Sequence, residues 1–202
     1  MPALPFEASD EPSAASPGAR TSIVVFDGRF SGACVKIKRI GCEHAQFAAA
    51  VEQSLLLARL RHANIVEVFR HLVEPPDFLY LVLDDCHTNL ATALEQREIN
   101  ASVVGRDVCR QMALGLQYLH GGVAADEHQV AAAGVGNSIL QHLVHGNLKP
   151  ANVLLKFRQS GNVCVKLADI GSLGSGHDAW QAPEVLGGAA PSLEADVFSL
   201  GC

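Results

Sequence analysis

The chain of 202 residues is poor in aromatic and charged side chains. Phe, Tyr and Trp make up 5% of it, with a single Trp, and charged residues make up 18% against 49% hydrophobic residues. Chains that stay disordered combine low hydrophobicity with high charge, so this balance excludes global disorder and allows a buried core. The length suits one domain or slightly more.

Cationic residues are not in excess. There are 15 Lys and Arg against 21 Asp and Glu, which gives a net charge of −6. This balance argues against nonspecific binding to nucleic acid or to anionic membranes. The longest apolar runs, such as 79–83, are far too short to span a bilayer. The N-terminal residues lack a basic start followed by a long apolar run, so they predict no secretory signal. We expect no nucleic-acid partner and no membrane segment in this chain.

The six cysteines form no Cys-x-x-Cys pair, and the nine histidines are scattered, so the sequence predicts no zinc site. We interpret the cysteines as reduced, partly buried thiols and expect a cytoplasmic protein. They are Cys34, Cys42, Cys86, Cys109, Cys164 and Cys202.

The first half of the chain alternates between strand and helix patterns. Residues 1–20 are rich in Pro, Ala, Ser and acidic side chains, which predicts a disordered leader. Residues 22–26, ended by Asp27-Gly28, and residues 34–40 predict an antiparallel strand pair. Residues 65–69 and 78–83, separated by Pro75-Pro76-Asp77, predict two more strands.

Two helices are predicted. The first covers residues 43–61, with apolar side chains on one face at Phe47, Val51, Leu55, Leu56 and Leu60. The second runs from Ser102, as N-cap, to His120. Its core face is predicted to be Val104, Val108, Met112, Leu116 and Leu119. Strands, a helix, strands and then helix and loops predict an α+β, two-lobed fold. Residues 121–143 are rich in Ala and Gly and show no clear period.

Residues 145–152 read His-Gly-Asn-Leu-Lys-Pro-Ala-Asn, and Asp169-Ile170-Gly171 follow. This pair of motifs resembles the catalytic loop (H-R-D-L-K-P-x-N) and the metal-binding loop (D-F-G) of protein kinases. Further family elements occur in the correct order. Residues 83–86 resemble the hinge, 182–184 the A-P-E motif, and 196–201 the start of the central helix of the large lobe.

A finer resemblance points to the kinase–endoribonuclease stress sensors of the endoplasmic reticulum. It depends on residues 35–40, on the Cys86-x-x-Asn89-Leu90 pattern, on residues 180–184 and on residues 196–199. The His-Gly-Asn-Leu-Lys sequence also resembles the kinase-homology regions of receptor guanylyl cyclases and of plant receptor pseudokinases.

The resemblance implies an ATP site in the small lobe. Lys38 would anchor the phosphates, with Lys36 at the position of a small residue over the adenine. The alternative register makes Lys36 the anchor and Cys34 the small residue. The carboxylate partner of the lysine would be Glu52, or its position would fall on Gln53. The hinge residues Leu83, Asp84 and Cys86 would meet the adenine. The glycine-rich loop is poorly matched by residues 16–22, which keep only Gly18.

The resemblance also implies a Mg²⁺ site at Asn152 and Asp169, whose hard oxygen donors suit that ion. Lys149 would contact the γ-phosphate. The catalytic Asp of the family, which accepts the proton of the substrate hydroxyl, is replaced by Asn147. Gly146 replaces the Arg that grips a phosphorylated activation loop in many kinases. The activation segment, 169–184, is short. Ile170 is expected to keep an apolar plug beside His145.

These features predict a kinase-like domain over residues 21–202, with a small lobe over 21–85 and an incomplete large lobe over 86–202 that carries an insert at 121–143. Because only six residues follow Asp196, we expect the chain alone to be marginally stable. We expect a catalytically impaired pseudokinase that binds ATP and Mg²⁺ weakly and acts with a protein substrate or regulatory partner. The alternatives are an active serine/threonine kinase and a non-catalytic scaffold or gene fragment.

Overall fold

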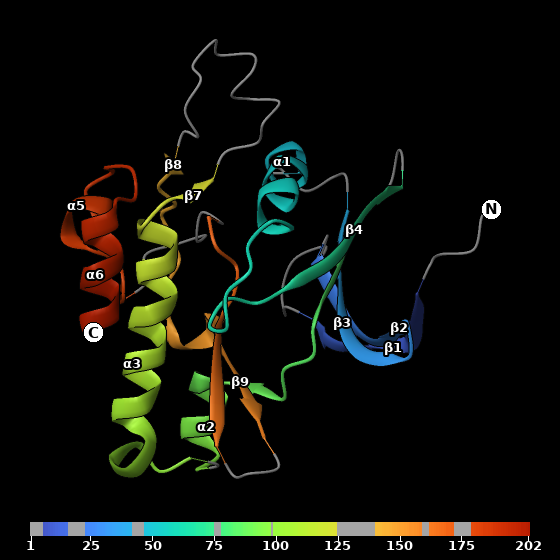
Figure 1. Ribbon diagram of the computed structural model, residues 1–202, viewed down its shortest axis with the longest axis horizontal. Coiled ribbons are helices and arrows are strands. Elements are labelled where there is room, and N and C mark those ends of the chain that lie inside the picture. The colour runs from blue at the N-terminus through green and yellow to red at the C-terminus, as the bar shows by residue number, and fades with distance from the viewer. Residues whose placement is uncertain are drawn as a thin grey trace. The chain divides into compact units, whose positions relative to one another are not determined.

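A computed structural model describes residues 6–15, 23–41, 47–74, 78–97, 99–124, 140–158, 162–171 and 179–202. The described residues divide into two compact units, coloured from blue to red along the chain in Figure 1. The first unit runs up to Arg61 and continues over Val66–Cys86, and the second comprises His62–Ile65 and His87–Cys202. The first is mainly sheet and the second mainly helix, which confirms the predicted α+β class.

The first unit is built on a five-stranded antiparallel sheet with strand order β1-β2-β3-β5-β4. The strands are β1 (Glu7–Ala15), β2 (Ile23–Phe30), β3 (Ala33–Gly41), β4 (Val68–Glu74) and β5 (Phe78–Asp84). The predicted pair over 22–26 and 34–40 is confirmed as β2 with β3, and the strand predicted over 78–83 is confirmed as β5. Its partner β4 runs from Val68 to Glu74, so the strand predicted over 65–69 is placed too early in the sequence. The predicted turn at 75–77 lies outside the described residues.

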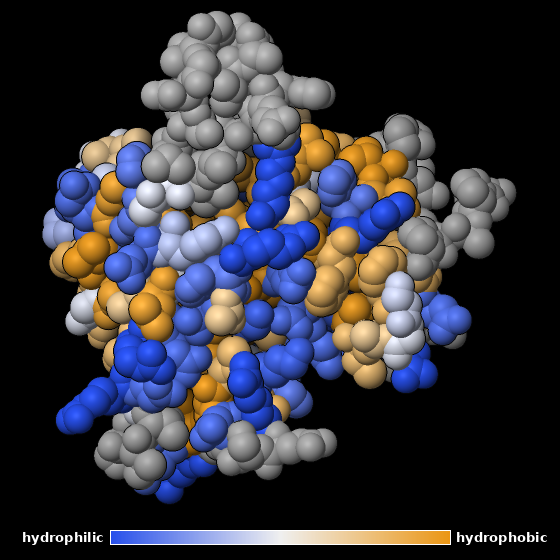
Figure 2. Space-filling model, viewed as in Figure 1, coloured by the Kyte–Doolittle hydropathy of each residue, from blue (hydrophilic) through white to orange (hydrophobic). Residues whose placement is uncertain are grey.

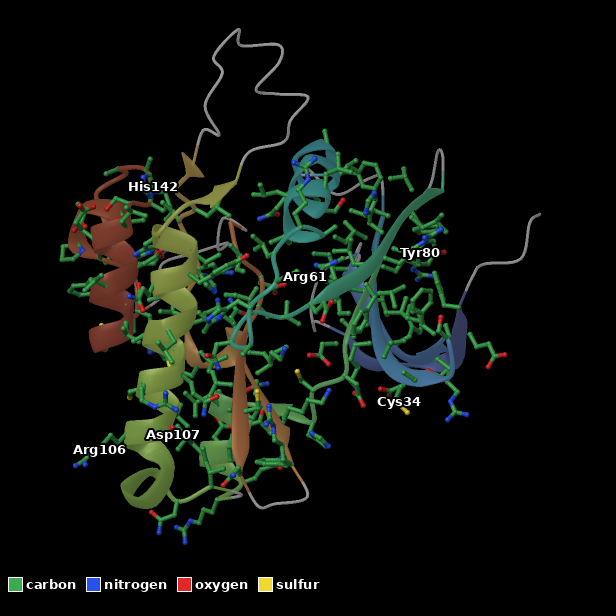
Figure 3. All side chains as sticks on the ribbon, viewed as in Figure 1. Cys34, Arg61, Tyr80, Arg106, Asp107 and His142 are labelled. Atoms are coloured by element: carbon green, nitrogen blue, oxygen red, sulfur yellow. The ribbon has the colours of Figure 1, made fainter. Side chains whose placement is uncertain are left out.

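Strand β1 corrects the expected disordered leader. Glu7–Ala15 pair with β2, and Phe6 just before them is buried with its ring 5.6 Å from Tyr80, which Figure 3 labels. Because these residues join a ladder and an apolar cluster, the expectation of disorder is wrong for them. Residues 1–5 and 16–20 lie outside the described part.

The expectation that Asp27-Gly28 ends the strand is wrong, because β2 continues through both residues to Phe30. A Cβ at Gly28 would lie 2.5 Å from the backbone oxygen of Glu7 and 2.3 Å from a methyl carbon of Ile37. The glycine therefore permits β1 to approach β2 closely. The chain turns instead at Ser31-Gly32, where both residues have positive φ.

Helix α1 (Phe47–Leu57) covers one face of the sheet. Phe47, Ala50 and Val51 pack against a buried cluster of strand residues on β3 and β5. Leu55, which the sequence pattern places on the same apolar face, is 47% exposed. Figure 2 shows hydrophobic side chains gathered where Figure 1 has α1 and the far end of β4, and Leu55, Phe69 and Val73 are exposed on these two elements.

The second unit is organised around α3 (Ala101–His120), which confirms the predicted second helix. Ser102, predicted as its N-cap, lies inside the helix instead. Of its predicted core face, Val108, Met112, Leu116 and Leu119 are buried, and the side chain of Val104 lies outside the described part. The helices α2 (Leu90–Glu95), α5 (Pro183–Leu186) and α6 (Leu193–Gly201) and the 3₁₀ helix η1 (Pro150–Asn152) complete its helical part. Helix α6 packs against α3.

Short strands complete the second unit. A hairpin of β9 (Val153–Phe157) and β10 (Val163–Leu167) is joined by β6 (Thr88–Asn89), and β7 (Val123–Ala124) pairs with β8 (Leu140–Gln141). The β7–β8 pair joins the two ends of the predicted insert at 121–143, whose residues 125–139 lie outside the described part.

The segment His62–Ile65 belongs to the second unit because a buried amide network holds it there. Asn64 Nδ2 donates to Gln111 Oε1 and to the backbone oxygen of Val165, both at 3.0 Å. The backbone oxygen of Asn64 accepts from Leu167 N–H at 2.9 Å. Three separate parts of the sequence are thereby fixed to one another.

Candidate active site

The loop from His145 to Asn152 is closed on itself by Asn152. The backbone N–H of Asn152 donates to Lys149 O, and its side-chain Nδ2 donates to Asn147 O, both at 2.8 Å. Asn152 is buried, so its side-chain orientation is fixed by these contacts. With its nitrogen engaged, the amide oxygen of Asn152 is the atom that can ligate a cation.

The loop after β10 is joined to this first loop by backbone hydrogen bonds. Ala168 N–H donates to Asn152 O at 3.0 Å, and Gly171 N–H donates to His145 O at 2.7 Å. Between them lies Asp169, whose φ of 55° is a left-handed conformation that, apart from glycine, Asn and Asp adopt more often than most residues. The structure thus brings Asn147, Lys149, Asn152 and Asp169 together on two tied loops, and Ile170 is buried as expected.

Asp196, on α6, holds the start of the 145–152 loop. Its Oδ2 accepts from His145 N–H at 2.7 Å and lies 2.9 Å from Nε2 of His120, while its Oδ1 accepts from Gly146 N–H at 2.8 Å. Asp196 is 1% exposed, and a buried carboxylate is tolerated only with such partners. The sequence places Asp196 at the start of a helix but does not predict that it accepts hydrogen bonds from the 145–152 loop. No local pattern reveals hydrogen-bond partners about fifty residues earlier in the chain.

His145 is a buried neutral histidine. Burial lowers its pKa, and this effect outweighs the opposing influence of the Asp196 and Asp169 carboxylates. Nδ1 accepts from Asn147 N–H at 3.3 Å, which places the ring proton on Nε2. Within the described part of the molecule Nε2 is buried and has no hydrogen-bond partner. The ring therefore acts as an internal support of the loop.

Gly146 occupies a position that favours glycine. Its φ is 68°, and a Cβ there would lie 3.3 Å from Cβ of Pro191. The residue that replaces the family's Arg is therefore matched to its backbone conformation and to its neighbour.

The first unit holds the residues predicted to bind the nucleotide. Lys36 and Lys38 lie two residues apart in β3 and so share a sheet face, opposite Leu83 and Leu81 of β5. The cluster that includes Leu81 is the one that α1 packs on. The ammonium of Lys36 forms an ion pair with Asp27 on β2. This contact engages Lys36 within the sheet.

The remaining predicted residues of the first unit lie in β5, just after it and in α1. Leu83 and Asp84 end β5, and the backbone N–H of Asp84 donates to Glu67 O at 3.0 Å. Cys86 is buried. Glu52 lies in α1, and its side chain is outside the described part. The same holds for the glycine-rich-loop region at 16–22 and for residues 172–178 of the activation segment.

Asn152 and Asp169 are the residues of this chain that could hold a magnesium ion. No group of three or more His, Cys, Asp or Glu residues that could hold a metal is found among the residues that the structure describes. An amide oxygen and one carboxylate from two tied loops match an ion that keeps several water ligands.

The described helices also include none long and apolar enough to cross a membrane.

The comparisons with known proteins agree with this arrangement. The family model of the protein kinase domain matches residues 27–202. The chain belongs to the protein kinase family. The bilobal α+β kinase fold is supported by the crystal structure of Rad53 in complex with AMP-PNP, with a TM-score of 0.68 over 98% of this chain and 46% of that one, at 22% identity.

Among curated relatives of this kinase domain, the serine/threonine-protein kinase/endoribonuclease ire-1 of Caenorhabditis elegans is 31% identical over 199 residues. The alignment covers 89% of this chain and 18% of that protein. The human kinase/endoribonuclease IRE2 is 29% identical over 88% of the chain and 19% of its own length. The mouse inactive serine/threonine-protein kinase PLK5 is 29% identical over 82% and 26%. The predicted likeness to the stress-sensor kinases is confirmed, and the chain spans about a quarter or less of these relatives.

Proposed function

We propose that this kinase domain is catalytically impaired and acts as a nucleotide-binding regulator of a protein partner. The observation that carries the proposal is Asn147, which replaces the Asp that accepts the substrate proton in the family. The loop that contains Asn147 is held in place by hydrogen bonds to Asn152 and Asp196. The frame of the catalytic loop is kept while its base is absent. The name of the mouse relative, an inactive kinase, supports this assignment.

The loss of the base affects one part of the reaction. An Asn amide cannot accept the proton of a substrate hydroxyl, and general-base catalysis contributes about 10²–10⁴ in rate. Positioning and electrostatics supply most of the remaining acceleration in phosphoryl transfer. The domain can therefore retain nucleotide binding while transfer is slow.

The proposal gives each predicted binding residue one role. In this proposal Lys38 anchors the phosphates with Glu52 as its partner, as the resemblance to the family implies. The hinge residues Leu83, Asp84 and Cys86 meet the adenine. Lys149 contacts the γ-phosphate, and Asn152 and Asp169 hold Mg²⁺, which when bound offsets phosphate charge. The AMP-PNP complex of Rad53 supports an ATP-like ligand.

Nucleotide binding is tested by thermal shift with ATP in the presence and absence of Mg²⁺. A ligand that binds only the native state stabilises it by RT ln(1 + [L]/Kd). We expect a Mg²⁺-dependent rise in Tm that Asp169→Ala and Asn152→Ala abolish, while Glu95→Ala, an exposed acidic residue of α2, leaves it unchanged. Equal shifts in wild type and Asp169→Ala would contradict the assignment of the metal ligands.

An active serine/threonine kinase is the second candidate. It is favoured by the placement of Lys149, Asn152 and Asp169 on two tied loops. Incorporation of labelled γ-phosphate into a protein substrate separates the two, since transfer at the rate of ordinary kinases (about 1–100 s⁻¹) would establish activity and refute impairment.

We further propose that the domain functions in the cytoplasm. The described cysteines, which are Cys34, Cys86, Cys109, Cys164 and Cys202, are free thiols, as suits a reducing compartment. Immunolocalisation of the native protein tests this placement.

A further inference from the structure

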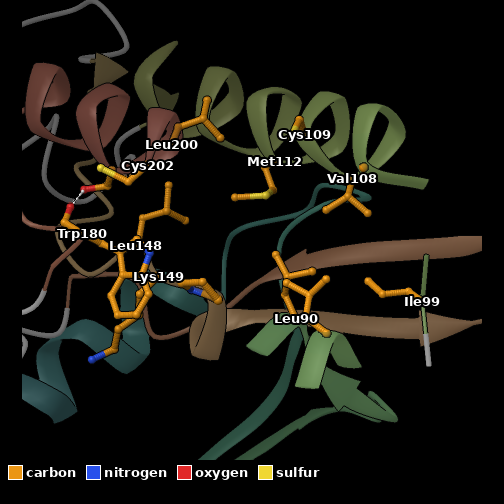
Figure 4. Close-up of a pocket in the computed structure, with 14 residues that line it drawn as sticks. Leu90, Ile99, Val108, Cys109, Met112, Leu148, Lys149, Trp180, Leu200 and Cys202 are labelled. Atoms are coloured by element: carbon orange, nitrogen blue, oxygen red, sulfur yellow. Dashed lines mark hydrogen bonds between the residues drawn. The ribbon is translucent and has the colours of Figure 1, made fainter. Parts of the chain in front are cut away.

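The second unit contains a cavity of about 250 Å³ whose wall is almost wholly apolar. In Figure 4, Val108 and Met112 extend from α3 toward Leu90 of α2, and Leu148 of the catalytic loop lies at one end. Val108, Met112 and Leu148 are buried, so the inner wall is part of the core. Cys109, also in the wall, is exposed, so the cavity reaches from solvent to the back of the catalytic loop.

The side chains known to line the cavity provide no available charge for a ligand. Lys149 is among them, but it has a partner in the structure and is assigned above to the γ-phosphate. The hydroxyl of Ser199 is engaged by the backbone oxygens of Trp180 at 2.7 Å and of Ala195 at 2.9 Å. A charged group that entered this space would lose its hydration without gaining a partner. The lining therefore suits an uncharged ligand.

The volume of the cavity indicates the size of that ligand. An engineered apolar cavity of about 150 Å³ stays dry and binds benzene. Scaling benzene by the ratio of the two volumes gives a ligand of about ten ring atoms, which is the size of two fused rings. A helix or an extended peptide is larger than this space.

The chemistry of the wall favours an aromatic ligand over a saturated one. The wall contains the thioether of Met112, the thiols of Cys109 and Cys202 and the indole of Trp180. Sulfur atoms make favourable contacts with the edges of aromatic rings, and one aromatic ring attracts another in offset or edge-to-face geometry. A saturated ring system of the same size gains from burial of its surface alone.

We propose that this cavity is a binding site for a neutral bicyclic aromatic molecule. The rings lie between α3 and Leu148, in contact with Met112 and Trp180. Burial of the apolar surface contributes most of the affinity, and the sulfur and indole groups select the aromatic ring. The ligand differs from ATP in charge and in polarity, so the site does not depend on the proposed nucleotide binding.

Isothermal titration calorimetry with benzofuran, a neutral bicyclic aromatic, tests the proposal. Octahydrobenzofuran is its saturated analogue, and benzoate is an anion with the same number of non-hydrogen atoms. We expect saturable binding of benzofuran with a negative change in heat capacity, as burial of apolar surface produces. The saturated analogue should bind about threefold or more weakly, and benzoate at least about tenfold more weakly.

Gly105 offers a variant that fills the cavity. It lines the cavity within α3 and has open space around an added Cβ. Gly105→Leu should abolish the binding of benzofuran, while its higher helix propensity favours folding, which circular dichroism checks. Ala113→Leu, at an exposed position of the same helix that is not among the lining residues, is the matched control and should bind benzofuran as wild type does.

Met112→Leu is a second variant, which removes a sulfur atom at nearly constant volume. It should narrow the preference for benzofuran over octahydrobenzofuran, and an unchanged preference would refute the role of Met112 in selecting the aromatic ring.

The other outcomes are distinct. No saturable binding in wild type, or equal affinity in wild type and Gly105→Leu, overturns the proposed site. Equal affinity for benzofuran and its saturated analogue overturns the assignment of an aromatic ligand. Benzoate that binds as tightly as benzofuran overturns the assignment of a neutral one. Failure of ATP binding leaves each of these results in place.

Discussion

Asp196 accepts a hydrogen bond from the backbone N–H of His145 at 2.7 Å, and by this contact α6 holds the first residue of the catalytic loop. The same carboxylate also accepts a hydrogen bond from Gly146 N–H and lies 2.9 Å from His120 Nε2. Because all of these groups are buried or partly buried, none can exchange its partner for water without local opening. The position of the loop is therefore a property of α6 as much as of the loop sequence.

Asp196→Ala tests this support. The substitution leaves two backbone donors and His120 without their acceptor, so we expect a loss of about 3–5 kcal/mol in the free energy of unfolding, as when one partner of a buried charged pair is removed. Urea unfolding followed by circular dichroism measures it. Asp196→Asn keeps one acceptor oxygen and should lose less.

Glu194→Ala, two residues away on the exposed side of α6, is the control and should have a much smaller effect. Equal losses in the Asp196 and Glu194 variants would mean that Asp196 does not hold the loop.

Gly146→Ala tests the left-handed backbone of the loop. A residue with a Cβ at φ 68° costs about 1–2 kcal/mol, and the contact with Pro191 adds to it. We expect lower stability in urea denaturation. Gly105→Ala in α3 has open space around its Cβ and should raise stability by about 0.5–1 kcal/mol, since glycine is unfavourable within a helix. Opposite signs for the two glycine variants are the expected pattern.

Buried His145 predicts an acid-sensitive fold. Its pKa is lowered in the folded state from the ordinary value of 6.5, so below about pH 6.5 the unfolded chain binds a proton that the folded chain does not. Stability should fall as the pH decreases from 6.5 toward the lowered pKa and should not depend on this group above 6.5.

Urea midpoints between pH 5.5 and 7.5 measure the acid sensitivity. His145→Asn, whose Oδ1 can accept from Asn147 N–H, should flatten the dependence. His71→Asn in β4 removes a histidine of the first unit as the control. An unaltered slope in His145→Asn would assign the acid sensitivity elsewhere.

Gln111 links α3 to Asn64 and to β10 by hydrogen bonds, so we expect its contribution to stability to be coupled to theirs. Its Oε1 accepts from Val165 N–H at 2.9 Å and from Asn64 Nδ2, and its Nε2 donates to Val163 O at 2.9 Å. Gln111→Met should cost about 2–4 kcal/mol, because two buried donors lose their acceptor at about 1–3 kcal/mol each. A double-mutant cycle with Asn64→Ala should give a coupling energy of about 0.5–3 kcal/mol. Additive losses would show that the two amides act independently.

Asn147→Asp tests whether the missing base limits phosphoryl transfer. Restoring a carboxylate should raise the rate of phosphate incorporation by about 10²-fold or more. Asn147→Ala is the control, since it changes the residue without supplying a base. A gain below about twofold would place the defect elsewhere or show that the natural chain is already active.

Much of the fold could be predicted where alternation or helical period is continuous. Strands β2, β3 and β5 and helix α3 follow from such patterns. The short apolar runs Val153–Phe157 and Val163–Leu167 are also a strand signal, from which no strand is predicted above. Strand β1 lacks a signal, because a Pro, Ala and Ser composition forms a strand here only through its pairing with β2.

The sequence by itself determined the family of this protein and the chemical departures of its site. Asn147, Gly146, Asn152 and Asp169 can be read from two short motifs, because their roles depend on residue type and local spacing. Tertiary structure alone decided that Asp196 holds the loop, that His145 is neutral and buried, and that Gln111 joins three segments. The contacts of Asp196 and Gln111 are hydrogen bonds across about fifty residues, and the burial that lowers the pKa of His145 exists only once the chain has folded.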